Sequence, residues 1–222
     1  MGACYHTVAV EIASALALTS ALLLAAPLLE TTAPSAAEAL ARRVEARHRS
    51  LGDLTARFVQ SYRSGLIGRE VVESGTVSIK RPGRMLWEYR HPEKKTFVAD
   101  GRNFYFYVPA DKQVVVRTQA GERGIPALLL SGQSDIVAEF QPVLEPAPAG
   151  RRRLRLTPRK PDPEVESLLL DVDDRDRIRA IVLVDAQGNR SRFQFEDIRE
   201  NVGLQDRLFR FRVPAGVEVV AG

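Results

Sequence analysis

The chain has 222 residues, a formal net charge of +4 and one cysteine, Cys4. This length fits one domain preceded by a targeting segment. A single cysteine excludes a disulfide framework, so an exported form of the chain must be held together by its apolar core. The densest basic run, Arg151–Arg155, has no aromatic residue among its arginines, which favours a solvated strand face over a nucleic-acid contact. A rim that faces a partner or lipid headgroups is the alternative for this run.

The N-terminal segment has the order of a secretory signal peptide. Residues from Ile12 to Leu29 are apolar and uncharged, and the small residues Ser35 to Ala37 follow shortly afterwards. This order predicts a signal peptide over residues 1–37 that is cleaved after Ala37. The segment before Ile12 departs from the usual pattern, because it contains Glu11 and no basic residue. A retained membrane anchor is the alternative, since about 18 apolar residues can just span a bilayer.

Hydrophobic periodicity predicts a single domain over residues 38–222. A helix is expected between a start at Ser35 or Ala37 and an end at Gly52, because apolar residues recur there at helical spacing. Alternating polar and apolar residues with regularly spaced turns then predict an antiparallel meander of about 11 strands. After a first strand that begins at Leu54, the expected strands are Glu70–Lys80, Arg84–Tyr89, Lys95–Ala99, Arg102–Val108, Lys112–Thr118, Arg152–Thr157, Glu166–Asp171, Arg177–Val184, Arg190–Ile198 and Leu208–Val213.

Two short helices are expected, over Gly121–Gly132 and Ser134–Phe140, and Leu128, Leu129 and Leu130 form an apolar patch in the first of them. They interrupt the meander, so the fold class is mainly β with helices. The strands can pack as a sandwich, close as a barrel, or form a curved half-barrel that the helices cover. Periodicity alone leaves these three arrangements open.

Residues for catalysis or metal binding are scarce in this sequence. His48 and His91 have no metal-ligand spacing to other histidines, cysteines or carboxylates, and a zinc site needs three or four ligands. The run Asp171–Asp176 has the carboxylates of a calcium loop but lacks its glycine and distant glutamate, so a charged hairpin turn explains it better. The sequence therefore predicts no catalytic residue, no metal and no cofactor.

Large apolar side chains concentrate on one face of the expected sheet. Strand alternation places Val77 with Ile79, and Met85 with Trp87 and Tyr89, on shared faces. An ordinary sheet core is the simpler explanation for any one of them, whereas their concentration beside the apolar patch predicts a cavity under a helical cover. The residues expected to line that cavity are Phe58, Val77, Ile79, Met85, Trp87, Tyr89, Phe97, Phe104 and Phe106.

The segment Ser74–Val116 carries a motif that can be compared with known families. A strand ends in Lys-Arg-Pro, a strand with a tryptophan follows, and an Asp-Gly turn leads into an aromatic run and a later glutamine; the matching residues are Lys80, Arg81, Pro82, Trp87, Asp100, Gly101, Tyr107 and Gln113. An Ala-x-Phe-x-Gln motif precedes it, and the runs GIPALLLSG and FRVPAGVEVV follow it. These motifs resemble the periplasmic outer-membrane lipoprotein carrier family (LolA type) over nearly the whole of residues 38–222.

This resemblance implies an unclosed antiparallel barrel of about 11 strands, with lid helices around residues 121–140 over an apolar cavity. It implies a periplasmic carrier that binds the acyl chains of lipoproteins released from the inner membrane and delivers them to the outer membrane. The implied partners are acylated lipoproteins, an inner-membrane ABC-type release complex and an outer-membrane acceptor. The implied protein is a monomer, needs no cofactor and is not an enzyme.

Arg81 is the residue with the sharpest implied role. It falls on the same strand face as Val77 and Ile79, and a buried guanidinium needs acceptors. The resemblance implies that Arg81 is held by lid carbonyls in the segment Ile125–Ser131, and that Ile125, Leu128 and Leu129 take part in this lid switch. The alternative is an exposed arginine at a strand end. Leu86 is expected to point away from the cavity.

Two further interpretations of the chain stay open at the level of sequence. One is a periplasmic protein of the same fold that senses lipids or lipoproteins and regulates a membrane partner. The other is an anchored lipid-binding factor, which requires the N-terminal segment to be retained. The loop Arg63–Arg69 has an apolar Leu66–Ile67 tip, which is either a hairpin cap or a contact with a membrane or partner.

Overall fold

The computed structural model describes residues 34–66, 68–118, 129–130, 132, 134–162 and 164–221. The chain divides after Ala33, and the described fold is that of the unit from Pro34 onward. The first 33 residues of the predicted signal peptide therefore lie outside the described residues. Within the described ranges, no helix has the length and apolar content required to cross a bilayer.

Helix α1 (Ala36–Ser50) opens the unit, as its sequence predicts. Ser35 caps it: the Ser35 hydroxyl accepts from the Glu38 amide at 3.1 Å, and the Glu38 carboxylate accepts from the Ser35 amide at 3.2 Å. This reciprocal pair satisfies two amides that a helix start leaves without partners. One face of α1 is buried, with Leu40, Ala41 and Val44 in the core.

One twelve-stranded sheet makes up most of the unit. Its strands are β1 (Asp53–Arg63), β2 (Glu70–Lys80), β3 (Arg84–His91), β4 (Lys95–Asp100), β5 (Asn103–Val108), β6 (Gln113–Thr118), β7 (Phe140–Glu145), β8 (Arg152–Pro158), β9 (Ser167–Val172), β10 (Ile178–Val184), β11 (Arg190–Glu200) and β12 (Glu218–Ala221). The spatial order is β12-β6-β5-β4-β3-β2-β1-β11-β10-β9-β8-β7. Strands β7 and β12 are the two ends of this order, so the sheet is unclosed, as expected for a half-barrel.

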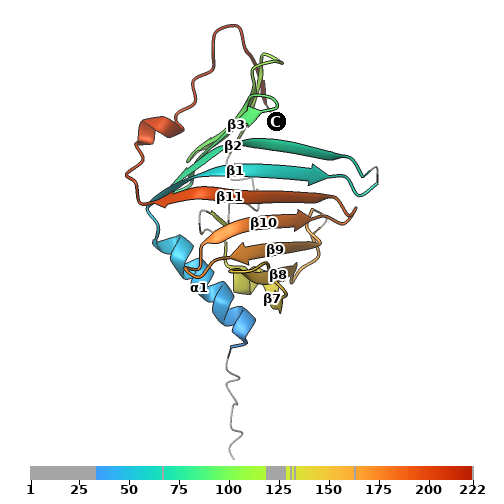
Figure 1. Ribbon diagram of the computed structural model, residues 1–222. Helices are drawn as coiled ribbons and strands as arrows, with labels where there is room; N and C mark the ends of the chain where they lie inside the picture. The colour runs from blue at the N-terminus through green and yellow to red at the C-terminus, as the bar shows by residue number, and fades with distance from the viewer. Residues whose placement is uncertain are drawn as a thin grey trace, which may run out of the picture. The chain divides into compact units, whose positions relative to one another are not determined.

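Helix α1 lies against the inner face of the sheet (Figure 1). It contacts β7 and the short helix α3 (Ile136–Glu139), and its apolar side chains join those of strands β1 to β3 and β8 to β11 in one buried cluster. Because strands from both halves of the order share this cluster, the sheet bends around the helix. The core is therefore built between one curved sheet and its helical cover, without a second sheet.

Two predicted elements differ from the structure: one helix is shorter than expected, and one strand does not form. The helix expected over Ser134–Phe140 is only the four residues of α3, and the chain continues directly into β7, which was not predicted. Pro142 lies inside β7, and proline disfavours a central strand but is tolerated in an edge strand such as this one.

The strand expected over Leu208–Val213 does not form. The short 3-10 helix η2 (Asp206–Phe209) occupies its start, and Phe209 is fully buried against Leu86 and Val98 on the outer face of the sheet. Residues 201–217 cross that face as a strap, and only β12 pairs, in parallel with β6. The apolar residues of this segment thus pack across the strands.

The Asp53 carboxylate fixes the start of the strap. It accepts hydrogen bonds from the amides of Val202, Gly203 and Leu204 at 2.7 to 3.0 Å. Three amide donors on one carboxylate are a strong, charge-assisted arrangement. Leu86 lies in the outer cluster, on the face expected for it.

The basic run is a set of salt bridges on the surface of β8. Arg152 pairs with Asp176, Arg153 with Asp171, and Arg155 with Glu145. The adjoining acidic run forms the β9–β10 hairpin turn, in which the Asp173 carboxylate accepts from the Arg175 and Arg177 amides at 3.0 Å. Its carboxylates are thus engaged by neighbouring amides and arginines, which is the structure of a charged turn.

Candidate functional site

The register of strands β1 to β5 aligns seven of the nine predicted lining residues in two rows across the inner face, and Phe58 and Tyr89 lie in a neighbouring row on either side of Gly75. Ala56, Val77, Trp87, Phe97 and Phe106 are successive partners in one row. In an antiparallel sheet, directly opposite residues point to the same side. The row therefore continues one apolar surface across five strands.

The second row runs parallel to the first. Leu54, Ile79, Met85, Ala99 and Phe104 are its successive partners. Both rows point to the inner face, because Val77, Ile79 and Trp87 belong to the same buried cluster.

The aromatic rings on this face form a continuous network. Phe58 meets Trp87 and Tyr89 edge to face, with ring centroids 4.9 and 4.8 Å apart. Tyr89 contacts Phe97 at 5.6 Å, and Phe97 stacks on Phe106 at 4.4 Å. Edge-to-face and offset contacts of this kind are the favoured geometries of aromatic pairs. The network thus spans β1 to β5 without a break.

Gly75 makes room for this network. It is the cross-strand partner of both Phe58 and Tyr89. A Cβ atom at this position would lie 1.9 Å from the Glu88 carbonyl oxygen, which is far inside contact distance. The backbones of β2 and β3 therefore approach too closely here for any residue but glycine.

Burial decreases along the predicted lining. Phe58, Val77, Ile79, Trp87 and Tyr89 are all buried, with no more than 8% of their surface exposed. Met85 and Phe97 are partly buried against the same cluster, and Phe104 and Phe106 are half-buried at the β5 end. All nine predicted residues thus lie on one inner face, deep at β1 and shallower at β5.

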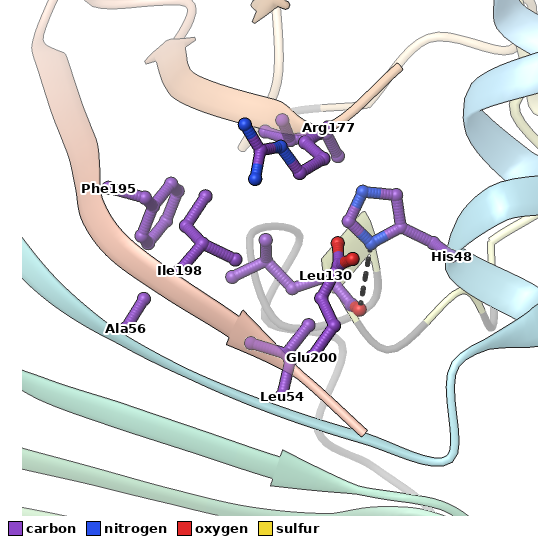
Figure 2. A pocket seen from close by; sticks show the side chains of 9 residues that line it. His48, Leu54, Ala56, Leu130, Arg177, Phe195, Ile198 and Glu200 are labelled. Carbon is purple, nitrogen blue, oxygen red and sulfur yellow. Dashed lines mark hydrogen bonds between the residues drawn. The ribbon is translucent and has the colours of Figure 1, made fainter. Parts of the chain in front are cut away.

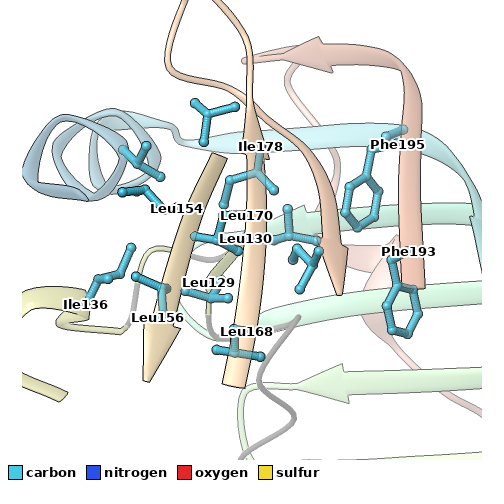
Figure 3. Close-up of a cluster of buried hydrophobic side chains, with 14 of the residues drawn as sticks. Leu129, Leu130, Ile136, Leu154, Leu156, Leu168, Leu170, Ile178, Phe193 and Phe195 are labelled. Carbon is cyan, nitrogen blue, oxygen red and sulfur yellow. The ribbon is translucent and has the colours of Figure 1, made fainter. Parts of the chain in front are cut away.

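The sequence interpretation missed the other half of this apolar surface. Phe193 and Phe195 on β11 contact Trp87 at 5.6 and 6.3 Å. Leucines of β8 and β9 and Ile178 of β10 continue the surface toward Leu129 and Leu130 (Figure 3). The sequence contained a signal for these residues: Phe193 and Phe195 are two positions apart within a predicted strand, so both point to the same face.

The C-terminal half of α1 holds the described part of the lid segment. The Glu45 carboxylate accepts from the Ile136 amide at the start of α3. His48 Nδ1 contacts the Leu130 carbonyl oxygen at 3.2 Å, and the Arg49 guanidinium donates to the Ser134 carbonyl at 3.5 Å. Leu129 and Leu130 are themselves buried. Three contacts, all from the C-terminal half of α1, therefore hold this segment.

Arg81, which follows strand β2 of the sheet, contacts the same part of α1 and the lid segment. Its guanidinium donates to the main-chain carbonyl of His48, and it lies beside Gly132. A Cβ atom on Gly132 would lie 2.1 Å from Arg81 Nη2 and 2.7 Å from the His48 carbonyl carbon. The predicted lid residues Ile125 and Leu128 are outside the described residues. The observed acceptor for Arg81 is thus on α1, next to the lid segment.

His48 is the residue at which these contacts meet. Its side chain contacts Leu130 and its main chain accepts from Arg81. Since a carbonyl can only accept, the Leu130 contact requires a proton on Nδ1. Burial, together with the charges of Arg47 and Arg81, lowers the His48 pKa to about 4, so the imidazole is neutral near pH 7.

A small cavity lies beside the His48 ring (Figure 2). Its volume is about 10 Å³, close to the space of one water molecule, and its walls include Leu54, Leu130, Arg177 and Glu200. His48 Nε2 is buried without a hydrogen-bond partner among the described residues. This space is far too small for an acyl chain.

Polar residues border the apolar face at its β1–β3 end. The Tyr89 hydroxyl donates to Gln60 Oε1 at 2.6 Å, and burial raises the Tyr89 pKa, with a further contribution from the charge of Glu73. Lys95 pairs with Glu73 at 2.6 Å and lies 4.5 Å from the centre of the Tyr89 ring. These residues give the apolar face a polar border at this end.

The surface is made of apolar and aromatic side chains. No group of three histidines, cysteines or carboxylates in the described ranges is placed to hold a metal ion. The fold and the surface define a class: an unclosed antiparallel half-barrel that presents an aromatic inner face beneath a helical cover.

Comparisons with known proteins identify the family. The family model described as "Outer membrane lipoprotein carrier protein LolA" matches residues 49–212. An outer-membrane lipoprotein carrier protein of Chromohalobacter salexigens is 32% identical over 198 residues, which covers 89% of this chain and 92% of that protein. The chain belongs to the outer-membrane lipoprotein carrier family, as its motifs predicted.

A second relative agrees with this assignment, and a solved structure shows the same fold. The carrier protein of Dechloromonas aromatica is 33% identical over 169 residues, or 75% of this chain and 80% of that protein. Among solved structures, an uncharacterized conserved protein from Thermus thermophilus shares the fold with a TM-score of 0.54 at 17% identity, covering 85% of this chain and all of that one.

Proposed function

We propose that this protein binds the acyl chains of lipoproteins on its aromatic inner face and carries them through the periplasm to the outer membrane. The observation that supports this most is the continuous aromatic surface from β11 to β5, which is only partly buried at its β4–β5 end. The protein acts by binding and release, without catalysis.

The energetics explain why such a surface suits a carrier. Each acyl methylene moved out of water contributes about 0.8 kcal/mol, so acyl chains leave a membrane only for another apolar site. Flat rings and the flexible Met85 side chain offer many weak dispersion contacts, with few directional bonds to break. Such a site can match a membrane in affinity and still release its cargo to a better acceptor.

Binding requires the cover to open. In the described arrangement, the contacts of Glu45, His48 and Arg49 hold the described part of the lid segment on α1, and Arg81 holds α1 on the sheet. An acyl chain that enters between the sheet and the cover competes with these contacts. Arg81 is thus the proposed switch: its bond stabilises the empty state and helps to expel the cargo.

The proposal includes the compartment and the partners. Residues 1–37 direct export and are then cleaved, acylated lipoproteins are received from an inner-membrane ABC-type release complex, and an outer-membrane acceptor takes them. Ser35 to Ala37, which the predicted signal peptide includes, form the cap and first residues of α1. N-terminal sequencing of the exported protein tests this cleavage site.

Uptake of a fluorescent fatty-acid probe tests the proposed site. Trp87 is the only tryptophan and lies on the inner face, so a probe bound there quenches its emission. Phe97→Gln, which places a polar group within the partly buried end of the network, should weaken binding about tenfold or more. Val143→Gln, at an exposed position on β7, is the matched control. Equal probe binding by the Phe97 variant, or binding without a change in Trp87 emission, contradicts the proposed site.

A further inference from the structure

The turn between β1 and β2 exposes a leucine to an unusual degree. Leu66 is 89% exposed, whereas the other exposed large apolar side chains among the described residues range from 40 to 56%. Two of these, Tyr62 and Val71, are cross-strand partners just behind the turn. Figure 1 shows the turn at the far end of two long strands, opposite the end where α1 joins β1. An apolar group therefore projects from the tip of an extended hairpin.

The turn is braced, so this exposure is built into the fold. The Gly65 amide donates to Asn189 Oδ1 at 3.0 Å, and Asn189 is held by Asp185 within the neighbouring β10–β11 turn. A Cβ atom on Gly65 would lie 2.6 Å from the Gln187 carbonyl oxygen. The two turns thus meet backbone to backbone, and Leu66 is directed away from this contact into solvent.

A collar of positive charge surrounds the tip. Arg63, Arg69 and Arg190 are all exposed, and none of them forms an ion pair with a described residue. Arg63 and Arg190 are direct cross-strand partners, an arrangement of like charges that destabilises a sheet unless an anion lies nearby. The carboxylates near this end include Glu70, opposite Arg63, Asp185, which its own turn engages, and Glu166, whose amide donates to the Val184 carbonyl beside that turn.

We infer that the β1–β2 tip is a membrane-docking element that inserts Leu66 among the acyl chains of an anionic phospholipid surface while the arginine collar contacts the phosphates. An apolar side chain with flanking cations matches the layered polarity of such a surface. The inference rests on the proposed function in one respect: a carrier that docks on the bilayer surface shortens the distance over which the acyl chains are exposed to water.

Vesicle sedimentation tests this inference without any cargo. The probe is the exported protein, mixed with vesicles of phosphatidylethanolamine and phosphatidylglycerol or of phosphatidylcholine alone. Binding should require phosphatidylglycerol and weaken with salt. Leu66→Asn should lower the affinity about tenfold, because one buried leucine side chain corresponds to at least one tenfold step. Leu208→Asn, at another exposed leucine, is the matched control and should bind as the parent does.

A second variant and a spectroscopic probe make the result specific. The double variant Arg63→Gln, Arg69→Gln should lose most of the salt dependence and bind about tenfold or more weakly. Leu66→Trp should shift its emission to the blue on anionic vesicles, against the constant signal of the buried Trp87. Equal binding by Leu66→Asn and the parent, equal losses in Leu66→Asn and Leu208→Asn, or no binding by the parent would overturn the inference.

Fatty-acid uptake separates this inference from the proposed function. In vesicle-free solution, Leu66→Asn should take up the fluorescent fatty acid as the parent does, and only its release to anionic vesicles should slow. If the parent fails to take up the fatty acid, the proposed function fails, whereas the vesicle-binding result is unaffected. If Leu66→Asn takes up, releases and binds vesicles as the parent does, the docking inference fails and the proposed function stands. A loss that appears solely with an outer-membrane acceptor protein assigns the tip to that protein and overturns the membrane inference.

Discussion

The buried imidazole of His48 predicts a measurable pH dependence of stability. Folding lowers its pKa from 6.5 to about 4, chiefly through burial, so the folded protein favours the neutral form. Between these two pH values the unfolded chain binds more protons than the folded protein. Stability therefore rises with pH through this interval, is complete above about pH 6.5, and is lost as the pH falls toward 4.

The size of this pH effect on the free energy of unfolding follows from the shift of the His48 pKa. Moving the His48 pKa from 6.5 to about 4 corresponds to roughly 3 kcal/mol of unfolding free energy. His48 is only 4% exposed, so solvent screening reduces this value little. The charged groups around the ring are Arg47 and Arg81, with Arg177 and Glu200 across the cavity. Three of these four are cations, which oppose a second positive charge.

Urea unfolding followed by Trp87 emission at pH 4 and pH 7 measures the effect. His48→Gln is the decisive variant, because its side-chain amide can still donate to the Leu130 carbonyl but does not titrate. Carboxylates that protonate near pH 4 affect both proteins alike, so the difference between them isolates His48. The parent should lose roughly 3 kcal/mol more than the variant on acidification. An identical pH dependence in the two proteins would refute the assignment of this charge sensitivity to His48.

Three further predictions concern the switch and the strap. Arg81→Leu should still take up acyl chains but pass lipoprotein on more slowly in a reconstituted transfer assay, since the empty state loses its bond to α1; normal transfer contradicts the switch. Phe209→Ala should cost about 3–5 kcal/mol in urea unfolding, because Phe209 is fully buried, and a loss below about 1 kcal/mol contradicts its role as an anchor. Asp53→Ala should cost about 3 kcal/mol by leaving three amides without their acceptor, and limited proteolysis should then cut within residues 201–217; unchanged protection argues against Asp53 as the clasp.

The sheet was largely predictable from sequence because its inner and outer faces alternate along each strand. Period-two patterns place Val77 with Ile79 and Met85 with Trp87, and the register confirms that these residues share the inner face. The same pattern placed Leu86 on the outer face. When one face of a sheet is buried, apolar side chains point to that face and polar side chains to the other, so the residue type predicts which way each side chain points.

Elements that depend on long-range packing were not predictable in the same way. The segment Leu208–Val213 has the apolar content of a strand, but Phe209 is buried by Leu86 and Val98, which lie more than a hundred positions earlier in the chain. The contact of His48 with Leu130 spans 82 positions. A lone histidine without metal-ligand spacing gave no local indication of this contact, because the partner is a backbone carbonyl.

The central claim is that the inner face carries the acyl chains of lipoproteins. The most direct test is native purification of the exported protein from periplasm, followed by mass spectrometry of what remains bound. The account predicts acylated lipoproteins in roughly equimolar amount, with less of them bound to Phe97→Gln and an unchanged amount bound to Val143→Gln. Free phospholipid alone, or an empty protein that also takes up no fatty-acid probe, would contradict the claim.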